Sequence, residues 1–483
     1  MILFLPLLIP IAGAFAILAW GAGWRAKPLA LAVGGVQILA ILRVVWHVYH
    51  FGAIQVGHFL RADALSVFFL LNLAVISGLV LVYSLDYMAH VPGDRFSSPR
   101  WFYGLLFLFV FTMAGVCLAS NLGLLWIMME MTTLASALLV GFYNTKGAVE
   151  AGWKYLIVCT VGIAFALFGT IVLYLVAVKS GLPSSIALDW VQLMDAAPRF
   201  RGNPQLLKLA FIFVAVGYGT KSGFFPMHSW LPDAHAEAPS PISALLSGVL
   251  INCAMYALMR YNAIVGRALG TGFTHNLLLG FGVASLVFAG LLIVVQRDLK
   301  RLLAYSSIEH MGVVAIGVGL GGAMGLYGAL LHVFNHSVGK TLLFFTAGNV
   351  RENFGTLRMD RIGGLGRSAP LTGAALVAGT VAIVGLPPFG LFVSEFAILS
   401  EAFKQSQFLV AALFLVTLSA VFGGMLRHLF GMLFREAKPG TGPMRMVFSA
   451  SLPIAVAALC LLLFGLHVPA GFTTLIHQAM AAL

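Results

Sequence analysis

Runs of about 20 predominantly apolar residues recur along the whole chain, and this recurrence limits the possible fold more than any other feature. A helix that crosses a bilayer needs a run of about this length, because its backbone hydrogen bonds must all be made within the membrane. We count about 14 such runs. Of the 483 residues, 60% are hydrophobic and 9% are charged. The sequence therefore predicts an all-α polytopic membrane protein.

The lysine and arginine residues indicate how the predicted helices are oriented. Eight of the 28 fall in connections on the side of the N-terminus, among them Arg260, and 16 fall on the opposite side, among them Arg95, Lys438 and Arg445. Connections rich in Lys and Arg remain in the cytoplasm. We therefore expect a multi-pass protein of a bacterial or archaeal cell membrane with both termini outside. The same rule explains the net charge of +12, so we expect no nucleic acid partner.

Two of the predicted spans combine helix-breaking residues with an ionisable side chain. Span seven, near residues 207–230, contains Lys221 shortly before Pro226, and span twelve, near 371–402, contains the sequence GLPPFG shortly before Glu395. An ammonium at the centre of a bilayer helix costs about 2.5–3.5 kcal/mol on insertion scales, so such a group faces a partner or a hydrated path. Paired interrupted helices indicate an ion-binding region between two repeats.

The spacing of these two interruptions predicts the organisation of the chain. They lie five spans apart, an odd number, so a five-helix repeat would be inverted in topology. We expect three N-terminal helices in residues 1–100, a first repeat in 101–262, a second repeat in 276–434 and a last helix in 435–483.

Several ionisable residues fall inside predicted spans. Glu130 lies mid-span, and we expect Lys221 to be its partner; a polar clamp between helices is the alternative. The spacing of His332, His336 and Lys340 puts all three on one helical face, over about 12 Å. Because imidazole both gives and takes a proton near neutral pH, this stripe predicts a lateral proton relay.

Other residues have two interpretations each. Glu395 is either the proton-releasing end of the relay or a capped terminus of a half-helix. Glu309 and His310 occupy the place in span ten that Glu130 occupies in span five, and they are possible members of the relay. Lys300 is either a proton-uptake residue or a cytoplasmic anchor.

The cysteine residues point away from redox chemistry in this chain. Cys117, Cys159, Cys253 and Cys460 occur singly, and no pair has metal-site spacing. We therefore expect no cofactor, no metal site and no redox centre here.

Four segments resemble a known family, and the resemblance spans about residues 60 to 430. The segments are TKSGFFPMHSWLPDAHAEAPSPISALLSG, DLKRLLAYSS, LHVFNHSVGKTLLFF and GLPPFGLFVSEF. They resemble the antiporter-like subunits of respiratory complex I, of multisubunit Na⁺/H⁺ antiporters and of membrane-bound [NiFe] hydrogenases. Their amino-acid sequences are most similar to component F of hydrogenase-4 and its formate hydrogenlyase relatives.

This resemblance implies about 14 helices with two inverted five-helix repeats and two broken helices. It also implies a set of relay residues, namely Glu130, Lys221, His332, His336, Lys340 and Glu395, with Lys300 matching a lysine that precedes the tenth helix. One departure concerns the eighth helix, where many relatives carry Lys or His. This chain offers Ser247, Asn252 and Tyr256 there, so water held by these groups would have to bridge the two halves.

Three functions are compatible with these observations. The first is a proton-translocating subunit of a redox-driven complex, with other membrane subunits, lipid and peripheral [NiFe]-hydrogenase-like or NADH-dehydrogenase-like redox subunits as partners. The second is a subunit of a cation/proton antiporter without redox chemistry, moving H⁺ or Na⁺. The third is an inert membrane scaffold, which leaves the buried titratable groups without a role.

Overall fold

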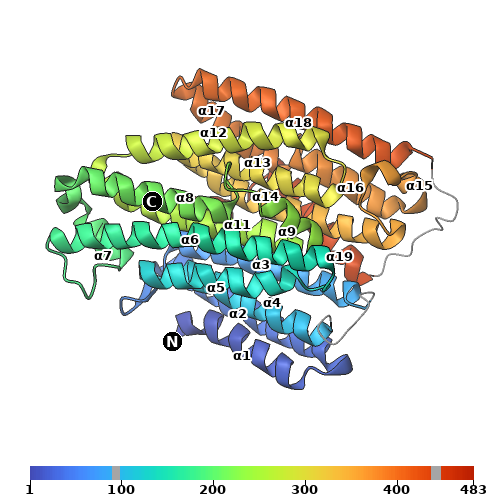
Figure 1. Ribbon diagram of the computed structural model, residues 1–483, viewed down its shortest axis with the longest axis horizontal. Coiled ribbons are helices and arrows are strands. Elements are labelled where there is room, and N and C mark those ends of the chain that lie inside the picture. Colours follow the sequence, from blue (N-terminus) through green and yellow to red (C-terminus); the bar gives the residue numbers. More distant parts are fainter. Residues whose placement is uncertain (90–97, 437–447) are drawn as a thin grey trace.

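The computed structural model describes residues 1–89, 98–436 and 448–483. Figure 1 shows long helices lying side by side, with α1 at one edge of the bundle and α18 at the opposite edge. Both termini lie toward the end of the bundle that carries α7. The predicted helical, multi-pass membrane architecture is confirmed. Arg95, Lys438 and Arg445, which contribute to the predicted orientation, lie outside the described residues.

The first part of the chain contributes three helical hairpins and one short β-hairpin. The elements are η1 (Ile2–Phe4), α1 (Leu5–Trp20), η2 (Gly23–Arg25), α2 (Ala26–Phe51), β1 (Ile54–Val56), β2 (Leu60–Ala62), α3 (Ala64–Tyr87), α4 (Pro99–Leu118), α5 (Leu122–Val140) and α6 (Lys146–Lys179). The antiparallel β1–β2 pair, which the sequence did not predict, connects α2 with α3.

The central part contains the first interrupted helix. Its elements are α7 (Trp190–Ala196), η3 (Ala197–Gly202), α8 (Pro204–Ser222), α9 (Leu231–Glu237), α10 (Ser240–Leu245), η4 (Leu246–Leu250), α11 (Ile251–Leu269), α12 (Gly272–Val295), α13 (Leu299–Leu320) and α14 (Gly322–Phe354). The segment η4 is a π-helical turn between α10 and α11.

The last part contains the second interrupted helix. Its elements are η5 (Met359–Arg361), α15 (Leu365–Ser368), α16 (Pro370–Ile383), α17 (Gly390–Lys404), α18 (Phe408–Phe434), α19 (Phe448–Leu466) and α20 (Ala470–Ala481). The helix α20 was not predicted, and it turns 77° away from α19.

In the described part of the chain, ten helices are long and apolar enough to cross a membrane, or 11 if α19 and α20 form one span. The remaining predicted spans correspond to α8 with α9, to α14 and to α16 with α17. The first and last of these are interrupted where the sequence places its helix breakers. A regular helix stops at Ser222 and restarts at Leu231, and another stops at Ile383 and restarts at Gly390.

A buried ion pair ties α3 to α11. Arg260 is 1% exposed and its guanidinium donates to the carboxylate of Asp63, the residue that caps the N-terminus of α3. The guanidinium carbon also lies 4.0 Å from the ring centroid of Trp190. The expected position of Arg260 in an outer connection is therefore wrong, because α11 continues to Leu269 and encloses this side chain.

The ion pair makes the stability of the fold depend on Arg260. In the Arg260→Met variant the Asp63 carboxylate stays buried without its counter-charge, and we expect a loss of about 3–5 kcal/mol. Thermal unfolding of the detergent-purified protein measures this as a lower midpoint. The control is Arg358→Met, which removes the exposed pair of Arg358 with Asp360 and should change little. An unchanged midpoint for Arg260→Met contradicts this role.

The pH dependence of the same interaction has a definite sign. Asp63 lies just before the membrane-spanning part of α3. Burial raises the pKa of its carboxyl group, but the charge and hydrogen bonds of Arg260 have the larger opposite effect, so the pKa lies below its usual 3.8. Because the pKa of Asp63 is lower in the folded than in the unfolded protein, the ion pair contributes its full stabilisation above pH 3.8. This stabilisation is lost as the pH falls through the pKa that Asp63 has in the folded protein. The unchanged protein should therefore keep the contribution of this ion pair at pH 5 and lose it only in stronger acid, whereas in Arg260→Met burial raises the pKa of Asp63, so its thermal midpoint should recover toward that of the unchanged protein at less acid pH.

Candidate functional site

Lys221 ends the first half of the interrupted helix at the centre of the bundle. It is the last residue but one of α8, and it is fully buried. Gly223 adopts a φ of +80°, a left-handed conformation that glycine takes without strain. The N–H of Phe224 then donates to the Gly219 carbonyl over 2.8 Å, which closes the helix end. The break therefore fixes the ammonium at the end of α8.

Two hydroxyl groups hold this ammonium. Lys221 Nζ donates to Thr133 Oγ1 over 2.7 Å and to the Tyr155 hydroxyl over 2.8 Å. Nζ also lies 4.8 Å from the centroid of the Tyr155 ring. Ser136 on α5 shares a further hydrogen bond of 2.7 Å with the Tyr155 hydroxyl. The helices α5, α6 and α8 thus build one polar cluster inside the bundle.

Glu130 belongs to this cluster but does not touch the lysine. Its Oε1 accepts a hydrogen bond of 2.7 Å from Thr160, and its Oε2 accepts one of 3.5 Å from Thr133. Among the described ion pairs there is none between Glu130 and Lys221, so the expected direct pairing is not formed. The Thr133 hydroxyl, which contacts both groups, joins them instead. Glu130 is also only partly buried, at the outer face of the chain.

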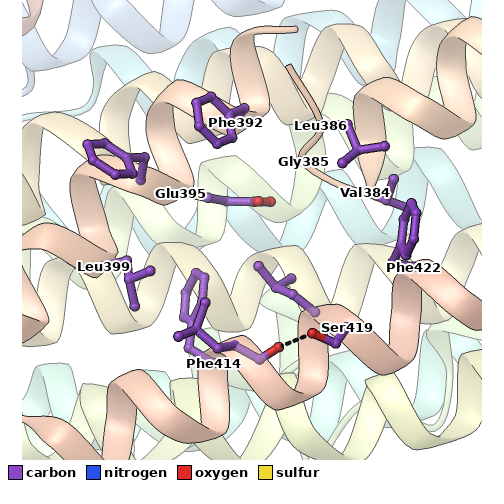
Figure 2. A pocket seen from close by; sticks show the side chains of 12 residues that line it. Val384, Gly385, Leu386, Phe392, Glu395, Leu399, Phe414, Ser419 and Phe422 are labelled. Atoms are coloured by element: carbon purple, nitrogen blue, oxygen red, sulfur yellow. Dashed lines mark hydrogen bonds between the residues drawn. The ribbon is translucent and has the colours of Figure 1, made fainter. Parts of the chain in front are cut away.

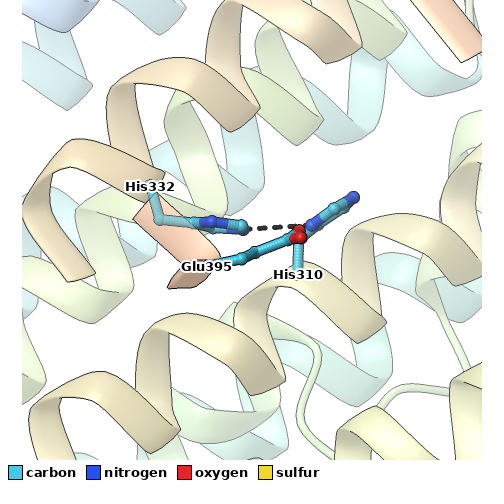
Figure 3. Close-up of side chains that lie close together, drawn as sticks. All are labelled: His310, His332 and Glu395. Atoms are coloured by element: carbon cyan, nitrogen blue, oxygen red, sulfur yellow. Dashed lines mark hydrogen bonds between the residues drawn. The ribbon is translucent and has the colours of Figure 1, made fainter. Parts of the chain in front are cut away.

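A second cluster lies beside the other interrupted helix (Figure 3). His310 Nδ1 and His332 Nε2 are 3.0 Å apart, and His332 Nδ1 lies 2.9 Å from Ser394 Oγ. Glu395 reaches the same point from α17, with a carboxylate oxygen within 4.8 Å of a nitrogen of each histidine. The structure thus brings together two predicted residues and His310, which the sequence left as a possibility.

The other predicted residues of this half extend the cluster along α13 and α14. Glu309 Oε2 lies 3.5 Å from His310 Nε2, and the His336 ring centroid lies 5.2 Å from that of His310. Lys340 Nζ donates to the Leu303 carbonyl over 2.9 Å. All of these side chains are buried. A buried row of imidazole, carboxylate and ammonium groups is suited to passing a proton.

Glu395 also faces an apolar cavity of about 350 Å³ between α17 and α18. Figure 2 shows its side chain extending from α17 among the lining residues, which include Phe392, Phe414 and Phe422. Its Oε1 has no hydrogen-bond partner among the described groups. Gly385, with a φ of +70°, lies so close to the carboxylate that a Cβ there would collide with it. The second break thus leaves room for this side chain.

The groups around Glu395 are also a possible set of metal ligands. His310, His332 and Glu395 offer nitrogen and carboxylate donors of the kind that bind transition metals. However, both nitrogens of His332 already lie within hydrogen-bond distance of protein groups. The contacts fit proton exchange, and the expectation of no metal site stays a prediction.

Lys300 is buried within the protein, in the first turn of α13. Its Nζ donates to the Ala238 carbonyl over 2.5 Å, at the C-terminal end of α9. A positive charge at this end of a helix is favourable. Asn252 lies in the first turn of α11, where it donates to Ser337 Oγ over 2.9 Å.

The sequence analysis did not identify the hydroxyl groups that connect the ionisable side chains within each cluster. Thr133 follows Glu130 by three residues, a spacing that puts both on one helical face, so this signal was available. Ser394 directly precedes Glu395 and was equally visible. Tyr155 could not be found this way, because only the packing of α6 against α8 brings it to Lys221.

Comparisons with known proteins agree with this architecture. Residues 119–423 match the family described as "NADH:quinone oxidoreductase/Mrp antiporter, TM", and residues 46–97 match "NADH-Ubiquinone oxidoreductase (complex I), chain 5 N-terminus". The chain is 39% identical over 419 residues to a hydrogenase-4 component F homolog of Methylacidiphilum infernorum, covering 86% of each chain.

Two solved structures share the fold. A chain of the membrane-bound sulfane sulfur reductase, an archaeal respiratory membrane complex, matches with a TM-score of 0.89 and 24% identity over 99% of this chain and 97% of that one. A chain of respiratory complex I from Thermus thermophilus matches with a TM-score of 0.83 and 25% identity over 100% and 98%. Both are chains of multisubunit membrane complexes.

The Thr133 hydroxyl generates a test of the first cluster. Thr133→Val keeps the shape of the side chain but removes the group between Glu130 and Lys221. Hydrogen bonds to charged groups contribute about 1.5–3 kcal/mol, so we expect proton transport to slow about tenfold or more. Proton uptake by proteoliposomes that contain the assembled complex measures the rate.

The matched control lies next to it on α5. The Thr132 hydroxyl donates over 2.6 Å to the Met129 carbonyl of its own helix, and Thr132→Val should retain the normal rate. Thr133→Ser, which retains the hydroxyl group, should transport protons at close to the normal rate. A normal rate in Thr133→Val would show that the hydroxyl does not connect the two charges.

Proposed function

This chain belongs to the NADH:quinone oxidoreductase/Mrp antiporter family of membrane subunits, and from that premise we propose that it translocates protons within a redox-driven complex. The complex is of the hydrogenase-4 or complex I-like type. The observation that supports this proposal most strongly is the presence of two largely buried polar clusters, one at each interrupted helix. Each cluster joins an acidic to a basic or imidazole group through contacts of 2.7–3.5 Å.

The two clusters occupy similar places in the proposed inverted repeats, although the first lies before its helix break and the second after it. In residues 101–262, the cluster is built by α5, α6 and the interrupted α8, and in residues 276–434 by α13, α14 and the interrupted α17. Within each set the second helix packs against both of the others. With α8–α9, α14, α16–α17 and α19–α20 each counted as one span beside the ten apolar helices, the fold has about 14 spans. These correspondences support the repeat.

The proposed relay begins at Lys221 and ends at Glu395. A rearrangement of the Glu130–Thr133 contact alters the electrostatic environment of the Lys221 ammonium and drives its proton toward His336. His336, His310 and His332 then carry the proton to Glu395, with Lys340 and Glu309 setting the local charge. Each step moves a proton between fixed groups and needs no bond-making chemistry in this chain.

Glu130 supports the involvement of partner subunits. It lies in the middle of α5 and remains partly exposed at the outer face. A carboxylate that faces lipid at this depth is costly, so a neighbouring membrane subunit covers it in the assembly. We place both termini outside, and we place the peripheral redox subunits, of the [NiFe]-hydrogenase or NADH-dehydrogenase type, on the cytoplasmic side that is rich in Lys and Arg.

The second candidate function is a subunit of a multisubunit cation/proton antiporter. The description of the matching family names both kinds of assembly, and the two clusters suit either. The candidates differ in their partners and in the force that drives the transport.

Purification of the chain from native membranes in mild detergent, followed by mass spectrometry of the copurifying proteins, distinguishes the two candidate functions. The redox-driven function predicts that hydrogenase-like or NADH-dehydrogenase-like subunits and iron–sulfur proteins copurify with the chain. Within that complex, His336→Gln should lower the number of protons moved per electron at least several-fold, while electron transfer continues. His467→Gln, at an exposed position, is the control.

Two outcomes would overturn the proposal. Recovery of antiporter-type subunits alone would favour the cation/proton antiporter. An unchanged proton-to-electron ratio in His336→Gln, with the redox subunits in place, would remove the histidines from the path.

A further inference from the structure

A cavity of about 520 Å³ lies between α12 and α18, and its lining residues belong to neither polar cluster. Figure 1 shows these two helices side by side at one edge of the bundle, where they pack against each other. Both helices end beside the cavity, α12 at Val295 and α18 at Phe434. These ends belong to the side rich in Lys and Arg, which we place in the cytoplasm. A cavity where two spans end lies at the level of the lipid headgroups.

Basic side chains surround this cavity. Its lining includes Arg297, which follows the end of α12, together with Arg427, His428 and Arg435 from the end of α18. All three arginines are exposed. Among the ion pairs of residues 1–89, 98–436 and 448–483, none includes any of these arginines. Three guanidinium groups without a carboxylate partner thus line one cavity.

The one carboxylate in the described lining is already engaged. The Asp360 carboxylate accepts hydrogen bonds from Nε and Nη2 of Arg358, at 3.2 and 2.9 Å. The backbone carbonyl of Asp360 accepts a further hydrogen bond of 2.7 Å from Arg435 Nη1, which holds this arginine at the cavity. Because Arg358 neutralises Asp360, the lining keeps its positive charge.

His428 adds an unused polar atom to the same cavity. Its Nε2 is shielded from solvent but has no hydrogen-bond partner among the described groups. A buried polar atom without a partner is unfavourable, so it indicates a ligand. Guanidinium groups bind phosphate through paired, charge-assisted hydrogen bonds, and the imidazole supplies one more. These groups together are suited to a phosphate group.

The depth of Arg427 in its span strengthens the case for a bound anion. Arg427 precedes the end of α18 by about two helical turns, or about 10 Å, and its side chain is exposed. An unpaired arginine among lipid chains is costly, and it is tolerated where the guanidinium reaches a polar headgroup. An anion beside Arg427 removes this cost.

Apolar side chains continue from the cavity toward the centre of the membrane. Leu291 on α12 is 64% exposed and lies about one turn before Val295, which lines the cavity. Val416 on α18 is 68% exposed and lies about three turns before Arg427, on the same helical face. Acyl chains that lead away from a headgroup in the cavity would pack on these side chains, whereas free phosphate would not use them. A phospholipid fits both surfaces.

We propose that this cavity binds the headgroup of an anionic phospholipid from the cytoplasmic leaflet. Arg297, Arg427 and His428 hold the phosphate group, and the acyl chains lie along α12 and α18. Basic pockets between membrane helices on the cytoplasmic side are suited to such headgroups. The lipid links the ends of α12 and α18 with η5, which contributes Met359 and Asp360 to the lining. This inference goes beyond the proposed function, because none of these residues belongs to the proton relay.

Native mass spectrometry of the assembled complex, titrated with phospholipids in mild detergent, measures the binding. Phosphatidylglycerol should bind more tightly than phosphatidylcholine. Arg427→Gln and Arg297→Gln should each weaken phosphatidylglycerol binding about fivefold, which corresponds to about 1 kcal/mol for one basic residue near a membrane surface. Arg427→Lys retains the charge and should keep most of the affinity. The same spectra show whether each variant assembles with all its subunits.

The matched control is Arg25→Gln. Arg25 is exposed in η2, on the same predicted side of the membrane, and it precedes α2 near the edge of the bundle opposite α18. Its replacement removes the same charge away from the cavity and should leave the binding unchanged. If Arg25→Gln weakens binding as much as Arg427→Gln, the overall surface charge attracts the lipid and the proposal fails. Unchanged binding in both Arg427→Gln and Arg297→Gln would also overturn it.

Two further outcomes would assign the cavity to another occupant. Displacement of phosphatidylglycerol by inorganic phosphate, in proportion to the phosphate added, would overturn the lipid site in favour of a site for free phosphate. A cryo-EM map of the assembled complex with a side chain of a neighbouring subunit in the cavity would overturn it in favour of a subunit interface. Density for a headgroup beside Arg427, with acyl chains along Leu291 and Val416, is the result that we expect.

Discussion

A lysine ammonium held inside an apolar bundle is the constraint on which the site depends. Lys221 is fully buried, and the hydroxyls of Thr133 and Tyr155 replace the water that it would otherwise bind. Because such a charge is costly at membrane depth, the helices around it must supply partners. The packing of α5, α6 and α8 meets this requirement, and Glu130 completes the cluster through Thr133.

The interrupted helices explain how the bundle tolerates charge at its centre. At each break the chain ends a helix and leaves backbone groups that a regular helix would satisfy, which is tolerated only inside the protein or beside a polar cavity. Lys221 lies before the first break, and Glu395 follows the second. Each helix break thus places an ionisable side chain in its half of the chain.

Much of this arrangement could be predicted from the sequence, because it depends on local patterns. Apolar runs, prolines and the spacing of His332, His336 and Lys340 are visible in one segment at a time, and the structure confirms the helices and their breaks. The direct pairing of Glu130 with Lys221 was predicted but does not form. Thr133, one helical turn along α5 from Glu130, lies between the two charged groups instead. Tyr155 was beyond reach for a similar reason: a lone tyrosine in an apolar helix gains meaning only when α6 packs beside α8.

The most direct measurement is the number of protons moved per electron by the assembled complex with Lys221→Met. Methionine fills a similar volume but cannot carry a charge. If Lys221 carries the transported proton, the ratio falls while electron transfer and the subunit composition stay the same. An unchanged ratio in a fully assembled variant would contradict the central claim and leave the buried lysine with a structural role.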